Sequence, residues 1–361
     1  MKIGDSMAKR RKLSKKGKKF FSILGVLFIT VIAVIICLNS DDDKQSTDTN
    51  DNKLDKKEEP KVEEKLKILD LDSNTRPYAV MINNIKTVWG YQSGIQDAYM
   101  VYEIIVEGGY TRLMALYKDK TLDRIGSVRS SRHYFLDYAL ENDAIYVHFG
   151  WSPQAQSDMK KLGVNNINFI SYNGYTRDRS LGLATEHTAF TTTNDIMEGA
   201  DYYGYRKTTD EKPLLGYSAK SVNTANMDGA VPANKVYIEF SASRSTSFEY
   251  DSVNKVYNRF QNNIIHKDYV TGLQYTAKNI ITYQVENYTI SGDNYGRQTI
   301  ENIGSGTGWY ISEGYAVPIT WEKSSRNSKT IYKYLDGTEI KVNDGNTYIE
   351  IQPTLKNLTI E

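Results

Sequence analysis

The stretch IGSVRSSRHYFLDYALENDAIYVHFG, residues Ile125–Gly150, places an arginine-containing turn, an amphipathic segment and an apolar strand in immediate succession. Ser127 or Ser130 is a suitable N-cap for a helix that runs to about Glu141, because a serine hydroxyl accepts a hydrogen bond from a free amide of the first helical turn. A turn, a helix and a strand in this order indicate the centre of a layered fold.

Charged side chains of this stretch form the first candidate binding site. On the expected helix, a spacing of four residues places Arg129, His133 and Asp137 on one face, with Arg132 beside them. A helix N-terminus offers unpaired amides and a partial positive charge, and two guanidinium groups next to it favour a phosphate or carboxylate ligand. The alternative is an intrahelical ladder of charges, which contributes only a few tenths of a kcal/mol per pair.

The strand at the end of the stretch supplies the candidate catalytic residue. His148 lies in the segment IYVHFG, next to Gly150. Because sites collect at strand ends in α/β sheets, His148 is a candidate general acid or base. The alternative is a histidine that is hydrogen-bonded in the core.

Two loop regions add further candidates. Glu103, Glu107 and Arg112 flank a pair of glycines, where a paired carboxylate system and a buried ion pair explain the residues equally well. Arg177 and His187 lie in a region rich in glycine and tyrosine, where binding residues concentrate. The predicted ligand-binding residues are Glu107, Arg112, Arg129, Arg132, His133, Asp137, Arg177 and His187.

No motif in the sequence indicates a metal or cofactor site. HExxH, HxH, calcium-loop, phosphate-loop and GxSxG patterns are absent. We therefore expect His133, His148 and His187 to bind no metal, and we expect no cofactor. The net charge of +1 combines nine basic residues before Phe20 with a mildly acidic remainder, which argues against a nucleic-acid binder.

The N-terminal segments predict a single-pass protein of the cell membrane. Residues 1–19 are basic, and residues 20–38 carry no charge and are long enough to cross a bilayer as a helix. The positive-inside rule keeps the N-terminus cytoplasmic and the folded part outside. Residues 39–65 are polar and charged, which predicts a disordered linker.

A cleaved signal peptide and a lipoprotein are the alternatives to this anchor. No Ala-x-Ala pattern closes the apolar segment, which also exceeds the usual length of a signal peptide's apolar region. Cys37, the only cysteine, is suitably placed for lipidation, but Ile36 stands where a small residue is expected. We therefore favour an uncleaved anchor.

Beyond the linker, the pattern predicts an α+β fold with two domains. Strand and helix patterns alternate over residues 66–206, which predicts a mixed α/β sandwich domain, although Asp97–Glu107 fits a helix or a strand. Residues 207–233 are polar, which predicts a connecting segment. Over residues 234–361, strand-like segments with Asp-Gly turns predict a β-rich antiparallel domain. The expected strands of the first domain are Tyr78–Ile82, Arg112–Tyr117 and Ile167–Ser171, and a further helix is expected at Asn194–Tyr203. Another helix is expected from Pro153 to Gly163, with Ser152 as its N-cap, Pro153 at its first position and Gly163 at its end.

Several motifs resemble the YerB-like lipoprotein family. In the first half these are RPYAVMINN (Arg76–Asn84), VYEIIVEGGYTRLMALY (Val101–Tyr117), the opening stretch and SPQA (Ser152–Ala155). In the second half, the motifs that resemble this family are HKDYVTG, GSGTGW, ITWEK and YLDGTEIKVNDGNTYIEI. The resemblance implies an exported bacterial protein with an α+β sandwich and a β-rich second part. It supplies no catalytic residues to transfer.

Three hypotheses for the function follow. The first is an extracytoplasmic protein that binds an anionic cell-envelope ligand, such as a wall glycopolymer or a lipid-linked phosphate, through Arg129 and Arg132. The second is a hydrolase or transferase acting on such polymers, with His148 as proton carrier. The third is an interaction scaffold for envelope proteins. The absence of a catalytic motif favours a binding protein over an enzyme.

Overall fold

The computed structural model describes residues 65–361. The predicted basic segment 1–19, the predicted membrane helix 20–38 and nearly all of the predicted linker 39–65 lie outside the described residues. From residue 65 onward, no helix combines the length and the apolar character needed to cross a bilayer.

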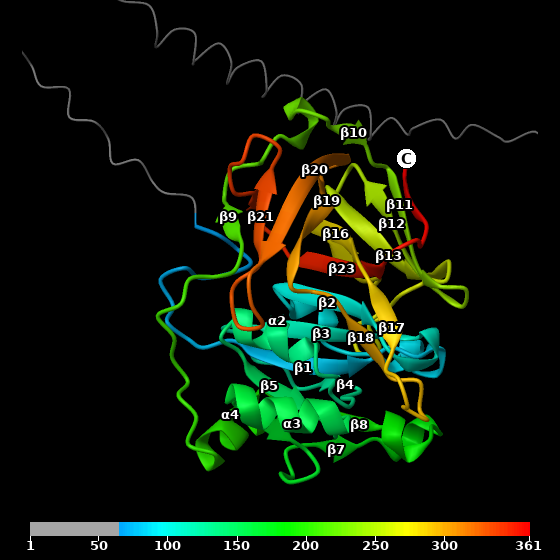
Figure 1. Cartoon of the computed structure of the whole chain (residues 1–361). Helices are drawn as coiled ribbons and strands as arrows, with labels where there is room; N and C mark the ends of the chain where they lie inside the picture. Colours follow the sequence, from blue (N-terminus) through cyan, green and yellow to red (C-terminus); the bar gives the residue numbers. More distant parts are fainter. Residues whose placement is uncertain (1–64) are drawn as a thin grey trace, which may run out of the picture. The chain divides into compact units, whose positions relative to one another are not determined.

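An 11-stranded mixed sheet runs through the molecule (Figure 1) in the order β10-β20-β19-β16-β23-β2-β3-β1-β5-β6, with β21 beside β20. Its strands from the first half of the chain are β1 (Tyr78–Asn83), β2 (Met100–Ile105), β3 (Thr111–Tyr117), β5 (Ile145–His148) and β6 (Asn166–Asn168). Those from the second half are β10 (Val231–Pro232), β16 (Asn279–Val285), β19 (Gly304–Ser312), β20 (Tyr315–Lys323), β21 (Ile331–Tyr334) and β23 (Thr347–Pro353). The fold is therefore α+β and dominated by strands.

Strand β23 joins the two halves of the chain into this one sheet. It pairs in parallel with β2 on one side and with β16 on the other. The expectation of a purely antiparallel second part is therefore wrong for β16 and β23. Parallel neighbours need a crossover and cannot be joined by a tight turn. The long connection between these two strands, residues 286–346, provides that crossover.

The central strands are covered on both faces, which explains their apolar sequences. Every residue of β1, β2 and β3 is buried. A strand that is buried on both faces shows a continuous apolar run, without the alternation of a half-exposed strand. Of the segment Asp97–Glu107, residues Met100–Ile105 form the strand β2 and none lies in an α-helix. The predicted strands at Tyr78–Ile82 and Arg112–Tyr117 are confirmed. The predicted strand at Ile167–Ser171 is shorter and begins earlier, as β6, because a turn follows Asn168.

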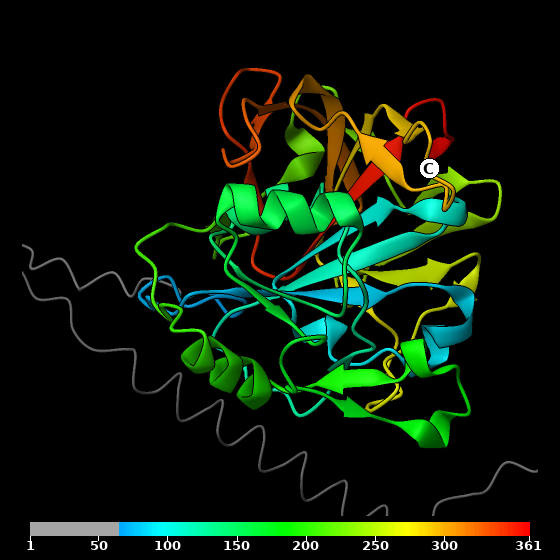
Figure 2. The same ribbon diagram turned by 60° about the horizontal axis from the view of Figure 1, so that its bottom comes forward.

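Within residues 65–361, three α-helices flank the sheet: α2 (Phe135–Glu141), α3 (Pro153–Leu162) and α4 (Thr193–Tyr202). Helices α3 and α4 lie on opposite sides of the first-half strands (Figure 2). The predicted caps of α3 are confirmed, since the Ser152 hydroxyl accepts the Ala155 N–H and Gly163 ends the helix in the left-handed conformation. The predicted helix near Asn194 is confirmed as α4.

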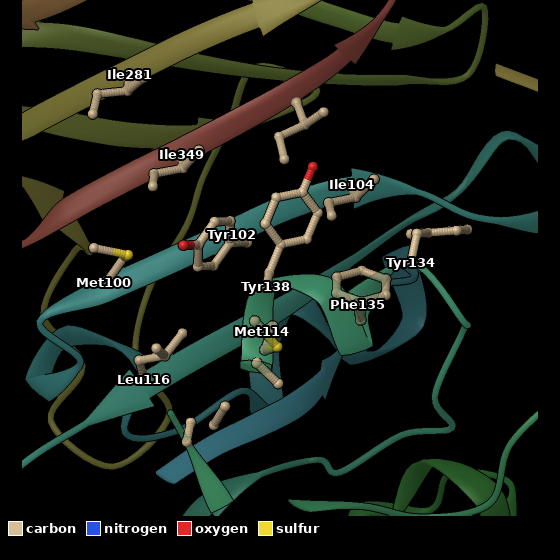
Figure 3. Close-up of a cluster of buried hydrophobic side chains, with 14 of the residues drawn as sticks. Met100, Tyr102, Ile104, Met114, Leu116, Tyr134, Phe135, Tyr138, Ile281 and Ile349 are labelled. Atoms are coloured by element: carbon tan, nitrogen blue, oxygen red, sulfur yellow. The ribbon is translucent and has the colours of Figure 1, made fainter. Parts of the chain in front are cut away.

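The helix expected to begin at Ser127 or Ser130 begins only at Phe135. The preceding residues are held as extended backbone, because the Arg129 N–H donates to Met81 O and the Ser131 N–H donates to Gly150 O. Phe135 and Tyr138 of the short helix point toward the side chains of β2 (Figure 3). Packing against the sheet therefore decides where this helix starts.

A second, six-stranded sheet packs over the β2, β23 and β16 region on the face opposite α2. On this face, Phe248 of the second sheet packs against Tyr348 of β23, with a distance of 5.7 Å between the two ring centroids. Its strands are β11 (Lys235–Ser241), β12 (Arg244–Asp251), β13 (Val256–Gln261), β14 (Ile264–Ile265), β15 (Thr276–Ala277) and β24 (Leu358–Ile360). The smaller sheets consist of β4 (Ile125–Gly126), β7 (Thr176–Arg177) and β8 (Ala189–Thr191), of β9 (Gly216–Ser218) and β22 (Lys341–Asn343), and of β17 (Asn287–Thr289) and β18 (Gln298–Ile300).

Candidate functional site

The carboxyl ends of the parallel strands β1, β5 and β6 form one edge of the sheet, which we call the carboxyl edge. The extended segment that contains Arg129 crosses this edge. The Arg129 N–H donates to Met81 O at 2.8 Å, and the Phe149 N–H donates to Arg129 O at 3.0 Å. Arg129 therefore lies between the ends of β1 and β5, where α/β sheets commonly bind ligands.

Arg177 is brought to the same edge as Arg129 by the short 3-10 helix Thr185–His187. A guanidinium N–H of Arg129 donates to Glu186 O at 3.3 Å, and a guanidinium N–H of Arg177 donates to Thr185 O. In the described part of the chain, no carboxylate lies within 4 Å of the Arg129, Arg177 or Arg179 guanidinium. The remaining described arginines, Arg76, Arg112, Arg124, Arg132, Arg206, Arg244, Arg259, Arg297 and Arg326, each pair with a carboxylate.

His187 lies beside these arginines, in surroundings that favour the neutral form of its ring. Its Nδ1 is 3.0 Å from the Asn83 side-chain amide, at the end of β1, and its Nε2 is 4.0 Å from a Glu186 carboxylate oxygen. Burial, with the charge of Arg129 next in importance, lowers the pKa of His187. The positive charge of this part of the edge therefore comes from Arg129 and Arg177.

Arg132, Arg112 and Glu107 form a partly buried ion triplet. The Arg132 Nε donates to one Glu107 oxygen at 2.8 Å, and Arg112 contacts the other oxygen at 3.2 Å. Burial would raise the pKa of Glu107, but the hydrogen bond from Arg132 and the two positive charges lower it to about 2. Burial and the charge of Arg132 lower the pKa of Arg112 to about 9. This geometry favours the ion-pair interpretation, and it leaves Arg132 less available to a ligand than Arg129.

His133 and Asp137 do not share a helix face with Arg129. The prediction that these three residues lie on one face of a helix is therefore wrong. The His133 Nε2 lies 3.0 Å from the Thr299 hydroxyl, and burial, with the charge of Arg326, lowers the pKa of His133 to about 4. Asp137 accepts a hydrogen bond from Arg326 at 2.7 Å, and burial raises its pKa to about 6. Both residues connect α2 to the second half of the chain.

A hollow of about 150 Å³ lies beside Arg132 and His133. It is also lined by the first turn of α3 and by the loop of the β17–β18 hairpin, including Asp293 and Arg297. Both of its arginines are already paired, Arg297 with Asp293 at 2.7 Å and Arg132 with Glu107. This hollow therefore offers no free guanidinium group to an anion.

His148, the candidate general acid or base, is fully buried. Its Nδ1 lies 2.9 Å from Gly150 O and its Nε2 lies 3.1 Å from the Asn166 side-chain oxygen. Burial lowers the pKa of His148 to about 4. This environment favours the alternative of a histidine that is hydrogen-bonded in the core, since no part of the ring is exposed to a substrate.

A second group of charged residues is buried between the two large sheets. Glu103 on β2 contacts the Arg244 guanidinium at 2.6 Å and also the Arg259 guanidinium. Thr111 donates to its carboxylate at 2.6 Å, and Glu350 lies opposite it on β23. We call Glu103, Arg244, Arg259 and Glu350 the inter-sheet cluster. All four side chains are shielded from solvent, so this cluster binds the sheets to each other.

Sequence reasoning missed the aromatic side chains that hold Arg177. Its guanidinium carbon lies 4.8 Å from the centroid of the Phe149 ring and 5.3 Å from that of Tyr175. The signal was the tyrosine-rich sequence around Arg177, which is equally typical of exposed strands. From residue 65 to the C-terminus, no group of three or more histidine, cysteine, aspartate or glutamate residues is arranged to hold a metal ion.

The fold and the motif order define an α+β protein built from two successive family domains. The model described as "Protein of unknown function (DUF3048) N-terminal domain" matches residues 66–206, and the model of that family's C-terminal domain matches residues 236–349. The chain belongs to this family, and the resemblance to YerB-like lipoproteins is confirmed.

One relative is similar over most of the length of both chains. "Putative lipoprotein YerB" of Bacillus subtilis (strain 168) is 28% identical over 291 residues, which cover 79% of this chain and 83% of the relative. The crystal structure of YerB from Bacillus subtilis superposes with a TM-score of 0.68 at 26% identity and covers 79% of this chain and 94% of that chain. The fold is thus shared with a solved member of the family.

Proposed function

We propose that this protein is anchored to the cell membrane, with its folded part outside, and binds an anionic cell-envelope ligand at the carboxyl edge. Arg129 and Arg177 hold the ligand. The observation that carries the proposal is their convergence from distant parts of the sequence, with no carboxylate within ion-pair distance of either among the described residues. Guanidinium groups free of carboxylates are suited to bind phosphate or carboxylate groups through charge-assisted hydrogen bonds.

The surroundings of the two arginines support an anion as the ligand. Arg112 and Arg132 lie behind Arg129 with a single carboxylate, Glu107, between them, so the ion triplet keeps a net positive charge. Burial lowers the pKa of Arg129, the Glu186 carboxylate opposes this shift, and the charge of Arg132 adds to it, so the positive charges of Arg129 and Arg132 act on one another. An anion that binds beside Arg129 would relieve this repulsion.

The anchoring part of the proposal is supported by the uncharged segment 20–38 with its basic flank, and by the lipoprotein name of the Bacillus subtilis relative. A protein held at the outer face of the membrane would meet wall glycopolymers, lipid-linked phosphates and other envelope proteins. Phosphate groups are common to the first two, so phosphate is the first ligand chemistry to test.

Replacing both arginines tests the proposal. We expect Arg129→Ala with Arg177→Ala in the full chain to weaken binding to a purified poly(glycerol phosphate) polymer at least about tenfold, since charge-assisted hydrogen bonds contribute roughly 1.5–3 kcal/mol each. The matched control is Lys160→Ala with Lys161→Ala, which removes two exposed charges at the opposite end of the same β5–α3–β6 unit. Binding is measured by titration calorimetry at low and high salt.

Unfolding midpoints of the three proteins separate loss of binding from loss of fold. Both arginines donate only to backbone carbonyls, so we expect the double variant to unfold at nearly the temperature of the unaltered protein. If the polymer binds the double variant and the lysine control equally well, the carboxyl edge is not the anion site.

A further inference from the structure

Four tyrosines form a continuous row of rings beside helix α4. The Tyr202 ring centroid lies 5.4 Å from that of Tyr172 and 4.9 Å from that of Tyr203. The Tyr203 and Tyr205 centroids lie 5.5 Å apart, with the two rings stacked. We call these four residues the tyrosine row. Tyr202 is 70% exposed and the other three are partly exposed, so the row belongs to the molecular surface.

Hydrogen bonds tie the tyrosine row to both ends of strand β6, which is the last strand of the large sheet. The Tyr172 N–H donates to Asn168 O, at the end of β6, at 3.0 Å. The Tyr205 hydroxyl accepts the N–H of Asn166, at the start of β6, at 3.2 Å and lies 3.1 Å from Asn166 O. The position of the row is therefore set by the sheet.

Two glycines make room for the Tyr172 ring. A Cβ on Gly174 would lie 2.5 Å from Cε1 of this ring, and a Cβ on Gly199 would lie 3.0 Å from the same atom. Gly199 lies inside α4, where glycine stabilises a helix less than alanine does. The ring thus packs against α4 at the one helical position where a side chain is missing, which fixes its place on the surface.

Carboxylates lie near the Tyr172 end of the row. Burial and then the charges of Glu198 and Asp195 raise the pKa of Tyr172. The two basic residues that follow the row in the chain are each paired with a carboxylate, Arg206 with Asp143 and Lys207 with Asp201. These charges make the tyrosine row a poor site for an anion, in contrast to the carboxyl edge.

Exposed rings with carboxylates beside them are suited to a sugar. A pyranose ring with equatorial substituents has only C–H groups on its faces, and these pack on the electron-rich face of an aromatic ring. The hydroxyl groups on its rim donate to carboxylates. Rings in a row can hold successive sugars of one chain, and tyrosine loses little conformational entropy on binding. The centre of a protein interface is instead depleted of charged residues.

We propose that the tyrosine row binds a neutral glycan, with successive sugar rings packed on Tyr172, Tyr202 and Tyr203 and with sugar hydroxyl groups directed to the nearby carboxylates. The proposed anion site uses other residues, so this second site does not depend on it. The alternative is that the four rings only stabilise one another and cover the end of α4.

Chitotetraose is a suitable probe, because it is a neutral chain of four sugars with equatorial substituents. We expect the full chain, reconstituted in phosphatidylglycerol nanodiscs, to bind chitotetraose at least about tenfold more tightly than N-acetylglucosamine in an NMR titration. The reason is that the longer chain contacts several rings at once, whereas the single sugar contacts one.

Substitution of Tyr202 assigns the binding to the tyrosine row. We expect Tyr202→Ala to weaken the binding of chitotetraose about tenfold, because it removes the most exposed ring of the row. Tyr202→Phe keeps the ring and should retain most of the affinity. The matched control is Tyr295→Ala, which removes another exposed tyrosine, 75% exposed, between β17 and β18, and should bind as the unaltered protein does.

Three outcomes would overturn the proposal. The first is that chitotetraose binds no more tightly than N-acetylglucosamine, and the second is that Tyr202→Ala binds it as tightly as the unaltered protein. The third is binding of choline in place of chitotetraose, lost in Tyr202→Ala, which would make the tyrosine row a site for organic cations. Because chitotetraose carries no phosphate, any of these results would leave the anion site at the carboxyl edge standing.

Discussion

The carboxyl edge and the inter-sheet cluster each contain two arginines, and these two pairs of arginines have different partners. At the edge, Arg129 and Arg177 donate to backbone carbonyls and have no carboxylate within 4 Å among the described residues. Between the sheets, Arg244 and Arg259 both contact one carboxylate, Glu103, and none of the three is exposed to solvent. The partner that tertiary structure supplies therefore decides whether an arginine binds sheets together or remains available to a ligand.

The two pairs of arginines should also differ in how much their removal, or the removal of their partners, changes the free energy of unfolding. A buried ion pair gives little net stability, because desolvation of both charges offsets their attraction, but removal of one partner leaves an uncompensated buried charge. Arg129 and Arg177 are half-buried and have no carboxylate within 4 Å among the described residues, so their removal leaves no unpaired buried charge and should cost much less. The two regions should therefore respond very differently to the same kind of substitution.

The largest effect is expected at Glu103. Glu103→Ala leaves the Arg244 and Arg259 charges buried without a carboxylate contact, so we expect a loss of about 3–5 kcal/mol in the free energy of unfolding, measured by urea denaturation. The control is Glu186→Ala at the carboxyl edge, whose side chain is 54% exposed and which should change stability by less than about 0.5 kcal/mol. Similar losses in the two variants would show that Glu103 does not compensate the buried charges of Arg244 and Arg259.

Arg132 and Arg129 should contribute differently to stability, because only Arg132 pairs with a carboxylate among the described residues. Arg132→Ala removes two hydrogen bonds to Glu107 but leaves Arg112 in contact with that carboxylate, so we expect a loss of about 1–2 kcal/mol in the free energy of unfolding. Arg129→Ala should cost less than about 0.5 kcal/mol. Urea unfolding of both variants gives the difference, and a larger loss for Arg129 than for Arg132 would reverse the roles assigned to them.

The smallest effect is expected at Glu350 and depends on pH. Burial and the nearby Glu103 carboxylate raise the pKa of Glu350 well above its usual value of about 4.5. Above that usual value the unfolded chain has released this proton while the folded chain retains it, so the contribution of Glu350 to stability falls as the pH rises. Glu350→Gln keeps the shape of the neutral side chain and removes the titration.

We therefore expect the stability of Glu350→Gln, relative to the unaltered protein, to increase between pH 5 and pH 8. The gain should exceed about 1 kcal/mol, since each unit of pKa difference corresponds to about 1.4 kcal/mol. Urea midpoints of both proteins at the two pH values give this change. A relative stability that stays constant, or that decreases, would show that Glu350 is ionised in the folded state.

The sequence alone determined the elements whose signals are local. Ser152, Pro153 and Gly163 predicted both ends of α3, because caps depend on residues within one turn of the helix. The apolar run at Tyr78 predicted β1, and the order of motifs predicted the family. The uncharged segment 20–38 still predicts a membrane anchor, but it lies outside the described residues.

Only the tertiary structure decided the start of α2, the parallel place of β23 and the partners of the arginines. Ser127 and Ser130 fit the pattern of a helix cap, yet their segment pairs with β1 and the chain beyond β5 instead. Arg129 and Arg177 were both candidates, but nothing local showed that Arg132 would be held by Glu107 or that Arg259 would meet Glu103. Sequence patterns report the neighbours of a residue along the chain, whereas the charge that remains on a surface depends on neighbours brought together by folding.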